Sequence, residues 1–229
     1  MSVFAVLFTT TLLLFSAAVV IYLRVGFTQR RAPIPLTALA AWAAWDGMQV
    51  FGFMRPYDAL YYFEPGFVLV EGLLLYLCFA HRARHCPGVP VAGLAAYALV
   101  VIVVSCAGIA ALGRALGDPQ GVVSQALVAV PFPALIVLRR TGALRPGQHP
   151  VAAVLFALAS AAAFAAMVID PPPGSRPGLN ALAYGVLLLF SAASAWVVLS
   201  ARRGPIAAQH SRPRPARRSR PCSPPDEAA

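Results

Sequence analysis

Residues 91–113 read VAGLAAYALVVIVVSCAGIAALG, a run of apolar and small side chains without a charged residue. About 20 such residues form a helix that is long enough to cross the hydrocarbon layer of a membrane. Comparable runs lie on both sides of this one, at 3–23, 34–54, 60–80, 121–138, 151–169 and 179–200. The pattern predicts an all-α membrane protein, with a bundle of seven transmembrane helices over residues 1–200.

The composition agrees with lipid as the solvent of this chain. Hydrophobic residues make up 59% of the 229 positions and charged residues 11%, which is about half the charged share of a soluble globular protein. Segment 3–23 lacks a basic start and an Ala-x-Ala cleavage site. We therefore expect it to remain as the first helix and not to be removed as a signal peptide.

The net charge of +10 comes from arginine, since the chain contains no lysine. The arginines lie between the predicted helices and in the tail, which favours topology signals over a nucleic-acid-binding face, and no nucleic-acid partner is predicted. Those that follow the first, third, fifth and seventh helices are Arg24, Arg30, Arg31, Arg82, Arg84, Arg139, Arg140, Arg145, Arg202 and Arg203. Cytoplasmic loops retain positive charge, so the N-terminus is predicted to lie outside.

Residues 201–229 are rich in Arg, Pro and Ser, and this composition buries too little apolar surface to fold. They are predicted to form a disordered cytoplasmic tail whose arginines suit contact with anionic membrane lipid.

The absence of lysine beside abundant Ala, Gly, Pro and Arg is typical of a GC-rich genome, and we expect the protein to lie in a bacterial cytoplasmic membrane. His81, His85 and His149 lie in basic loops without metal-ligand spacing, so no cofactor is predicted, and nothing in the sequence indicates an oligomeric state.

Two acidic residues lie at membrane depth, where an ionisable side chain is costly and is therefore a candidate for function. Asp46 belongs to the second predicted helix and Glu71 to the third. At about 1.5 Å per residue, both lie roughly 12–17 Å from the outer surface. Because the two helices are adjacent and antiparallel, we expect the carboxyl groups to reach each other or a shared cavity.

Aromatic and amide side chains are expected beside these acids. On the second helix they share the stripe of Asp46, at the spacing i, i+4, i+7, i+11. The candidate substrate-binding residues are Trp42, Trp45, Gln49, Phe53, Phe67 and, in the fifth helix, Gln125.

Burial and a neighbouring carboxylate both favour the neutral form of a carboxyl group, so such a pair is expected to hold one proton at neutral pH. In a ring-lined apolar pocket, that proton can start a carbocation cascade on an isoprenoid, since aromatic faces stabilise the cation. The alternative is structural: both acids hydrogen-bond to Gln49 or to neighbouring helices and hold the bundle together. The spacing alone favours neither interpretation.

Several short stretches resemble the integral-membrane terpene cyclase family of fungal meroterpenoid and indole-diterpene pathways and its bacterial relatives. The resemblance covers about residues 30–170 and rests on IPLTAL at 34–39, AWD at 44–46, FGFMRP at 51–56, FVLVE at 67–71, SQ at 124–125, LRR at 138–140 and the loop 142–148. It implies proton-initiated cyclisation of a prenylated, epoxidised substrate, with a lipophilic isoprenoid as the ligand. Asp46 and Glu71 would then be the catalytic acid and base.

The chain departs from the family pattern at its acids. The family has Glu at the place of Asp46 and Asp at the place of Glu71, and it has a further acid in its last helix, where this chain reads FSAASAW at 190–196. Two other functions therefore stay open. One is a small multi-pass transporter, because acids in the middle of the membrane also suit proton-coupled carriage. The other is a non-catalytic membrane protein that assembles with partners.

Overall fold

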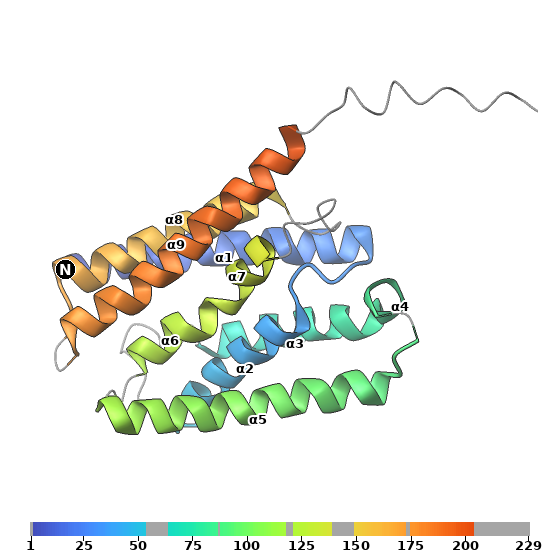
Figure 1. Cartoon of the computed structure of the whole chain (residues 1–229), viewed down its shortest axis with the longest axis horizontal. Helices are drawn as coiled ribbons and strands as arrows, with labels where there is room; N and C mark the ends of the chain where they lie inside the picture. The colour runs from blue at the N-terminus through green and yellow to red at the C-terminus, as the bar shows by residue number, and fades with distance from the viewer. Residues whose placement is uncertain are drawn as a thin grey trace, which may run out of the picture.

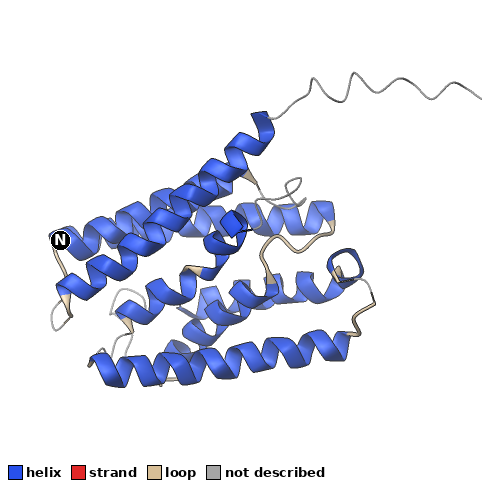
Figure 2. Ribbon diagram, viewed as in Figure 1, coloured by secondary structure: helices blue, strands red, loops and turns tan. Residues whose placement is uncertain are grey.

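The computed structural model describes residues 2–53, 64–86, 88–117, 121–138, 149–172 and 175–203. Within these ranges every regular element is an α-helix, as Figure 2 shows. The helices are α1 (Val3–Gln29), α2 (Leu36–Val50), α3 (Glu64–Ala80), α4 (Arg82–His85), α5 (Val91–Leu116), α6 (Val122–Ala129), α7 (Pro131–Leu138), α8 (Pro150–Ile169) and α9 (Pro177–Arg203). The predicted all-α class is confirmed for these residues. The disordered tail was predicted to begin at residue 201, but 201–203 are the last residues of α9, and the tail from residue 204 onward lies outside the described residues.

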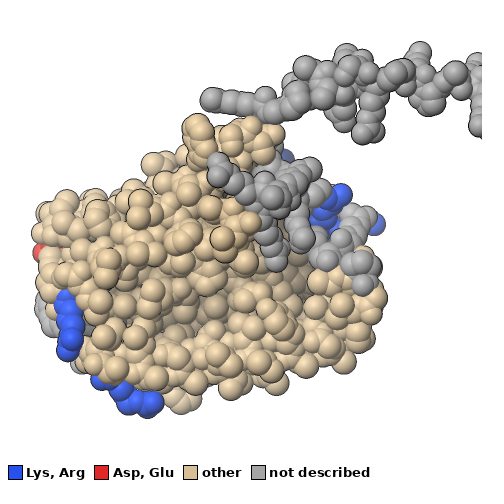
Figure 3. All heavy atoms as spheres, in the orientation of Figure 1, with Lys and Arg blue, Asp and Glu red and all other residues tan. Residues whose placement is uncertain are grey.

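Four helices, α1, α5, α8 and α9, are long and apolar enough to cross a membrane by length and composition. Two further apolar stretches, 65–80 and 122–138, are shorter. The exterior is apolar as well: Leu99, Val103 and Val104 on α5 are each more than half exposed. In Figure 3 the charged atoms lie toward the two ends of the face shown, and its broad middle is uncharged. Such a surface suits lipid and is unfavourable in water.

Two helix ends differ from the sequence prediction because of local backbone geometry. α1 continues to Gln29, beyond the predicted end at residue 23, and stops where Arg30 adopts a left-handed conformation (φ 50°, ψ 52°) and donates its N–H to Gly26 O. α2 stops at Val50 instead of residue 54, and Gly52 follows at φ 74°. Hydropathy indicates where a chain meets lipid and not where its helix stops.

The helices pack as two groups with a broken helix between them (Figure 1). In the first group, α1 packs on α8 and α8 packs on α9; in the second, α2 packs on both α3 and α5. α6 and α7 lie between the groups and contact α9 and α2. The first group buries small side chains such as Ala18, Ala152 and Ala166, which let helices approach closely in lipid.

Candidate functional site

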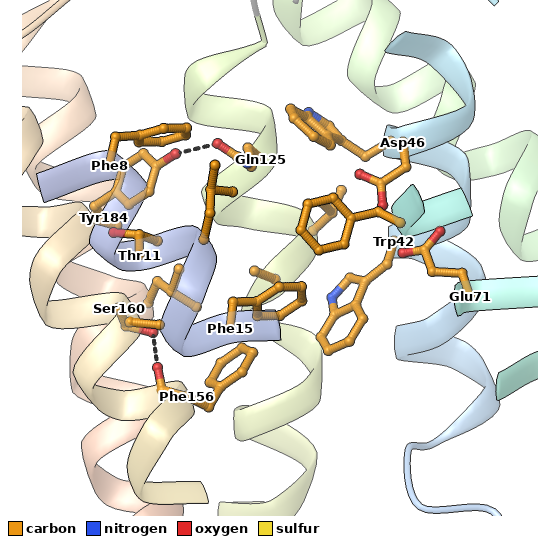
Figure 4. A pocket seen from close by; sticks show the side chains of 18 residues that line it. Phe8, Thr11, Phe15, Trp42, Asp46, Glu71, Gln125, Phe156, Ser160 and Tyr184 are labelled. Atoms are coloured by element: carbon orange, nitrogen blue, oxygen red, sulfur yellow. Dashed lines mark hydrogen bonds between the residues drawn. The ribbon is translucent and has the colours of Figure 1, made fainter. Parts of the chain in front are cut away.

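A pocket of about 110 Å³ is lined by both groups of helices, and Figure 4 shows it from close by. Six helices contribute to its walls: α1, α2, α3, α6, α8 and α9. The lining residues are Phe8, Thr11, Leu12, Phe15, Trp42, Trp45, Asp46, Phe67, Glu71, Gln125, Val128, Ala129, Phe156, Ala159, Ser160, Ala163, Tyr184 and Leu187. The walls are therefore mostly aromatic and aliphatic, with a few polar groups among them.

The two acids predicted from the sequence both line this pocket. Glu71 on α3 is buried, with 6% of its surface exposed, and Asp46 on α2 is partly buried. Figure 4 shows the two carboxyl groups on the same side of the pocket and turned toward each other. The prediction that they reach a shared cavity is thus confirmed. What the pair does there stays a prediction.

Helical spacing explains why these side chains converge. On α2, Trp42, Trp45 and Asp46 are spaced i, i+3, i+4, which places them on one face of the helix. On α3, Phe67 and Glu71 are four residues apart and also share a face. Because α2 packs directly on α3, both faces meet the same cavity.

The other predicted substrate-binding residues divide into two sets. Trp42, Trp45, Phe67 and Gln125 line the pocket, whereas Gln49 and Phe53 are not among the lining residues. Gln49 is buried one turn beyond Trp45 on α2. Phe53 is 76% exposed, because α2 ends at residue 50 and the helical stripe that was predicted to include Phe53 does not continue.

Four aromatic rings of the pocket pack against one another. The indole of Trp42 stacks on Phe156, with ring centroids 6.0 Å apart and an interplanar angle of 11°. Phe15 meets Trp42 edge-on at 5.6 Å and lies 5.7 Å from Phe67. Behind them, Phe132 touches Trp42 edge-on at 5.5 Å. These contacts hold the rings in fixed orientations, so their faces and edges form a rigid wall.

Three hydrogen-bonded polar residues, Gln125, Ser160 and Tyr184, line the part of the pocket formed by α6, α8 and α9. The hydroxyl of Tyr184 donates to Gln125 Oε1 at 2.6 Å, and Ser160 Oγ donates to the Phe156 carbonyl at 2.9 Å; Figure 4 marks both contacts with dashed lines. Ser160 Oγ also lies 3.0 Å from Ser191 Oγ, which is outside the pocket. Ser191 is fully buried in the stretch of α9 where the resemblance implies a further acid. α9 contains no carboxyl side chain.

The sequence analysis missed the contribution of α1 and α8. Phe8, Leu12 and Phe15 follow the spacing i, i+4, i+7 on α1, and Phe156 and Ser160 are one turn apart on α8. The stripe on α1 was visible in the sequence. It carried little information, however, because almost every face of a membrane helix is apolar.

Among the described residues, no group of three His, Cys, Asp or Glu side chains could hold a metal ion. Comparisons with known proteins find no matching family model, no matching curated protein and no matching solved structure. A function for this protein must therefore come from the chemistry of its pocket. That chemistry consists of two carboxyl groups in a ring-lined apolar cavity within a bundle of apolar helices.

Proposed function

We propose that this protein is a membrane-embedded, terpene cyclase-like enzyme that starts the cyclisation of a prenylated substrate by proton transfer from the Asp46 and Glu71 pair. One observation carries the proposal: both acids line a single pocket together with packed aromatic rings. The apolar exterior of the bundle supports a lipophilic isoprenoid as the substrate, because such a molecule is dissolved in the surrounding lipid.

The chemistry requires one proton shared by the two carboxyl groups. One carboxyl group gives its proton to the epoxide oxygen, or to a terminal alkene carbon, of the substrate. In the epoxide the C–O bond breaks as the oxygen becomes a hydroxyl, and a carbocation forms. A nearby double bond supplies its electron pair to that cation and forms the new C–C bond. The last cation loses a proton to a carboxylate, so atoms balance without a co-reactant, and ring faces stabilise each cation.

We propose in addition that the chain crosses the cytoplasmic membrane of a bacterium seven times, with its N-terminus outside. At about 1.5 Å per residue, α2, α3 and the α6–α7 segment reach roughly 22–26 Å, which is slightly less than the hydrocarbon thickness. The described arginines support this orientation. Arg24 lies within the last two turns of α1, and Arg30, Arg31 and Arg82 follow α1 and α3. Only Arg114 and Arg176, among the described residues, lie in the connections predicted for the other side.

Proton-coupled transport is the second candidate, and the broken helix supports it. α6 ends at Ala129 and α7 begins at Pro131, and Val128 and Ala129 line the pocket immediately before the break. Transporters place substrate sites beside discontinuous helices of this kind. They usually carry a matching break beside the site in a second repeat, however. The other one-residue interruption among the described helices, at His81 between α3 and α4, lies outside the pocket.

The test of the cyclase proposal uses the full chain in lipid nanodiscs and a C15 prenyl ether that carries a terminal epoxide. Asp46→Asn and Glu71→Gln remove a proton site while nearly preserving side-chain volume. Each is expected to lower turnover by about 100-fold or more, the usual contribution of a general acid or base. The matched control is Asp170→Asn, a carboxyl-to-amide change at the end of α8 and outside the pocket, which should retain turnover.

Folded double-variant protein with full turnover would reject the roles of both acids. If the unchanged protein turns over no prenylated epoxide, the cyclase proposal is wrong. The second candidate is then tested by proton flux into proteoliposomes, which should require Asp46 and Glu71.

A further inference from the structure

The indole N–H of Trp42 is a buried hydrogen-bond donor that has no hydrogen-bond partner among the described residues. Trp42 is 6% exposed, so bulk water does not satisfy this group. The neighbouring Trp45 differs, because its indole N–H donates to the Gly121 carbonyl at 3.4 Å. Buried donors in native proteins are nearly always paired, and one that the protein leaves unpaired indicates a water molecule or a ligand atom.

The unpaired donor belongs to the wall of the pocket. Figure 4 shows the indole of Trp42 between Glu71 and Phe15, with its nitrogen on the side that faces Phe15. The ring cannot easily turn away, because Phe156 stacks on its face at 6.0 Å and Phe132 meets it edge-on at 5.5 Å. The N–H therefore keeps a fixed direction in the cavity that also contains the two acids.

We propose that Trp42 binds an acceptor oxygen of the ligand through its indole N–H. An indole N–H can donate and cannot accept, so it selects an epoxide, ether, carbonyl or hydroxyl oxygen and does not recognise a plain hydrocarbon end. This inference rests on the proposed function and narrows it: of the two substrates considered for protonation, the epoxide is favoured over the alkene. Trp42 then holds the oxygen in the cavity of Asp46 and Glu71 and is a specificity-determining residue.

The experiment measures binding, so that it stays separate from turnover. Two C15 prenyl chains are compared, one ending in a methyl ketone and one in the matched alkene, in which CH₂ replaces the carbonyl oxygen. Neither is an epoxide, and both have nearly the same shape. Retention of each radiolabelled chain by the full protein in nanodiscs gives the two dissociation constants. The ketone is expected to bind about 3- to 10-fold more tightly, the usual value of one neutral hydrogen bond.

Trp42→Phe keeps a ring and removes the N–H, so the preference for the ketone should disappear. Trp196→Phe is the control for loss of an indole elsewhere, since Trp196 is 64% exposed and outside the pocket, and it should keep the preference. Equal affinities in the unchanged protein, or a preference that survives Trp42→Phe, would overturn the inference and leave a bound water as the partner of the indole. Failure of both chains to bind would overturn it as well.

A second measurement covers the case in which Trp42→Phe does not fold. The indole nitrogens of the unchanged protein are labelled with ¹⁵N, and the Trp42 signal is assigned by elimination from Trp45→Phe and Trp196→Phe. The ketone should move the indole proton of Trp42 downfield, and the alkene should not. Ketone preference without turnover of any epoxide would retain the inference and reject the cyclase, whereas turnover with equal affinities would reject the inference alone.

Discussion

At the scale of single residues, Asp170 connects the end of α8 to the start of α1. Its Oδ2 accepts the backbone N–H of Phe4 at 2.9 Å, and Ser2 Oγ accepts that of Ala5 at 3.1 Å. The first turn of a helix has N–H groups without intrahelical partners, and a negative charge is favoured there. α1 is thus capped once by its own chain and once by a residue far away in the sequence.

We expect Asp170→Ala to lower the free energy of unfolding by about 0.5–2 kcal/mol, the usual cost of losing a helix cap. Asp170→Asn keeps an acceptor oxygen and should cost less. Thermal unfolding of the full chain in one detergent measures both changes. Ser2→Ala is the control for loss of the local cap, and an Asp170→Ala midpoint equal to that of the unchanged protein would show that this cap contributes nothing.

At the scale of elements, the α6–α7 segment is interrupted by its own prolines. Pro131 and Pro133 have no backbone N–H, so two helical hydrogen bonds cannot form, and the ring of each clashes with the preceding turn. Regular bonding resumes with Ala134 N–H donating to Val130 O at 3.0 Å. Val128 and Ala129, which precede the break, line the pocket. The interruption therefore shapes one of its walls.

Pro131→Ala should stabilise the α6–α7 segment and lower the affinity of the pocket for its ligand. The restored N–H can bond to the Leu127 carbonyl, so the midpoint of thermal unfolding should rise. The affinity for the C15 prenyl methyl ketone should fall, because Val128 and Ala129 move in the wall of the pocket. The matched control is Pro150→Ala, because Pro150 lies in the first turn of α8, where no N–H is needed, and both readouts should hardly change. A lower midpoint for Pro131→Ala, or an unchanged affinity, would contradict this account of the break.

At the scale of the whole molecule, charge and apolar surface are separated. The described arginines lie at helix ends or in connections, and the helix surfaces between them are apolar. In the proposed topology this distribution orients the bundle, since translocated connections carry little positive charge. The two ends of α1 provide a direct test of the orientation.

Single cysteines at these two ends should differ in accessibility. In a variant whose four native cysteines are replaced by Ser, a membrane-impermeant maleimide should label Ser2→Cys in intact spheroplasts. Gln29→Cys should react only after permeabilisation. Both positions are exposed at opposite ends of one helix, so each is the control for the other. The reverse pattern would place the N-terminus inside.

The sequence by itself determined the helical class of the described residues and predicted that the two acids lie at matching depths. Both follow from local properties: apolar runs must form helices in lipid, because an unpaired backbone group is costly there, and rise per residue converts position into depth. The same local logic placed Trp42, Trp45 and Phe67 beside Asp46 and Glu71, because these residues share the facing sides of neighbouring helices.

Only the tertiary structure decided which further side chains complete the pocket. Phe15, Phe156 and Tyr184 come from helices that are distant in sequence, and apolar stripes in membrane helices are too common to indicate a partner. The ends of helices likewise depended on the backbone conformation of single residues. Because α2 ends at Val50, Phe53 does not lie on the helical stripe to which the sequence assigned it. That the N–H of Trp42 has no partner among the described residues became visible only in the tertiary structure, because a missing contact is a property of packed side chains.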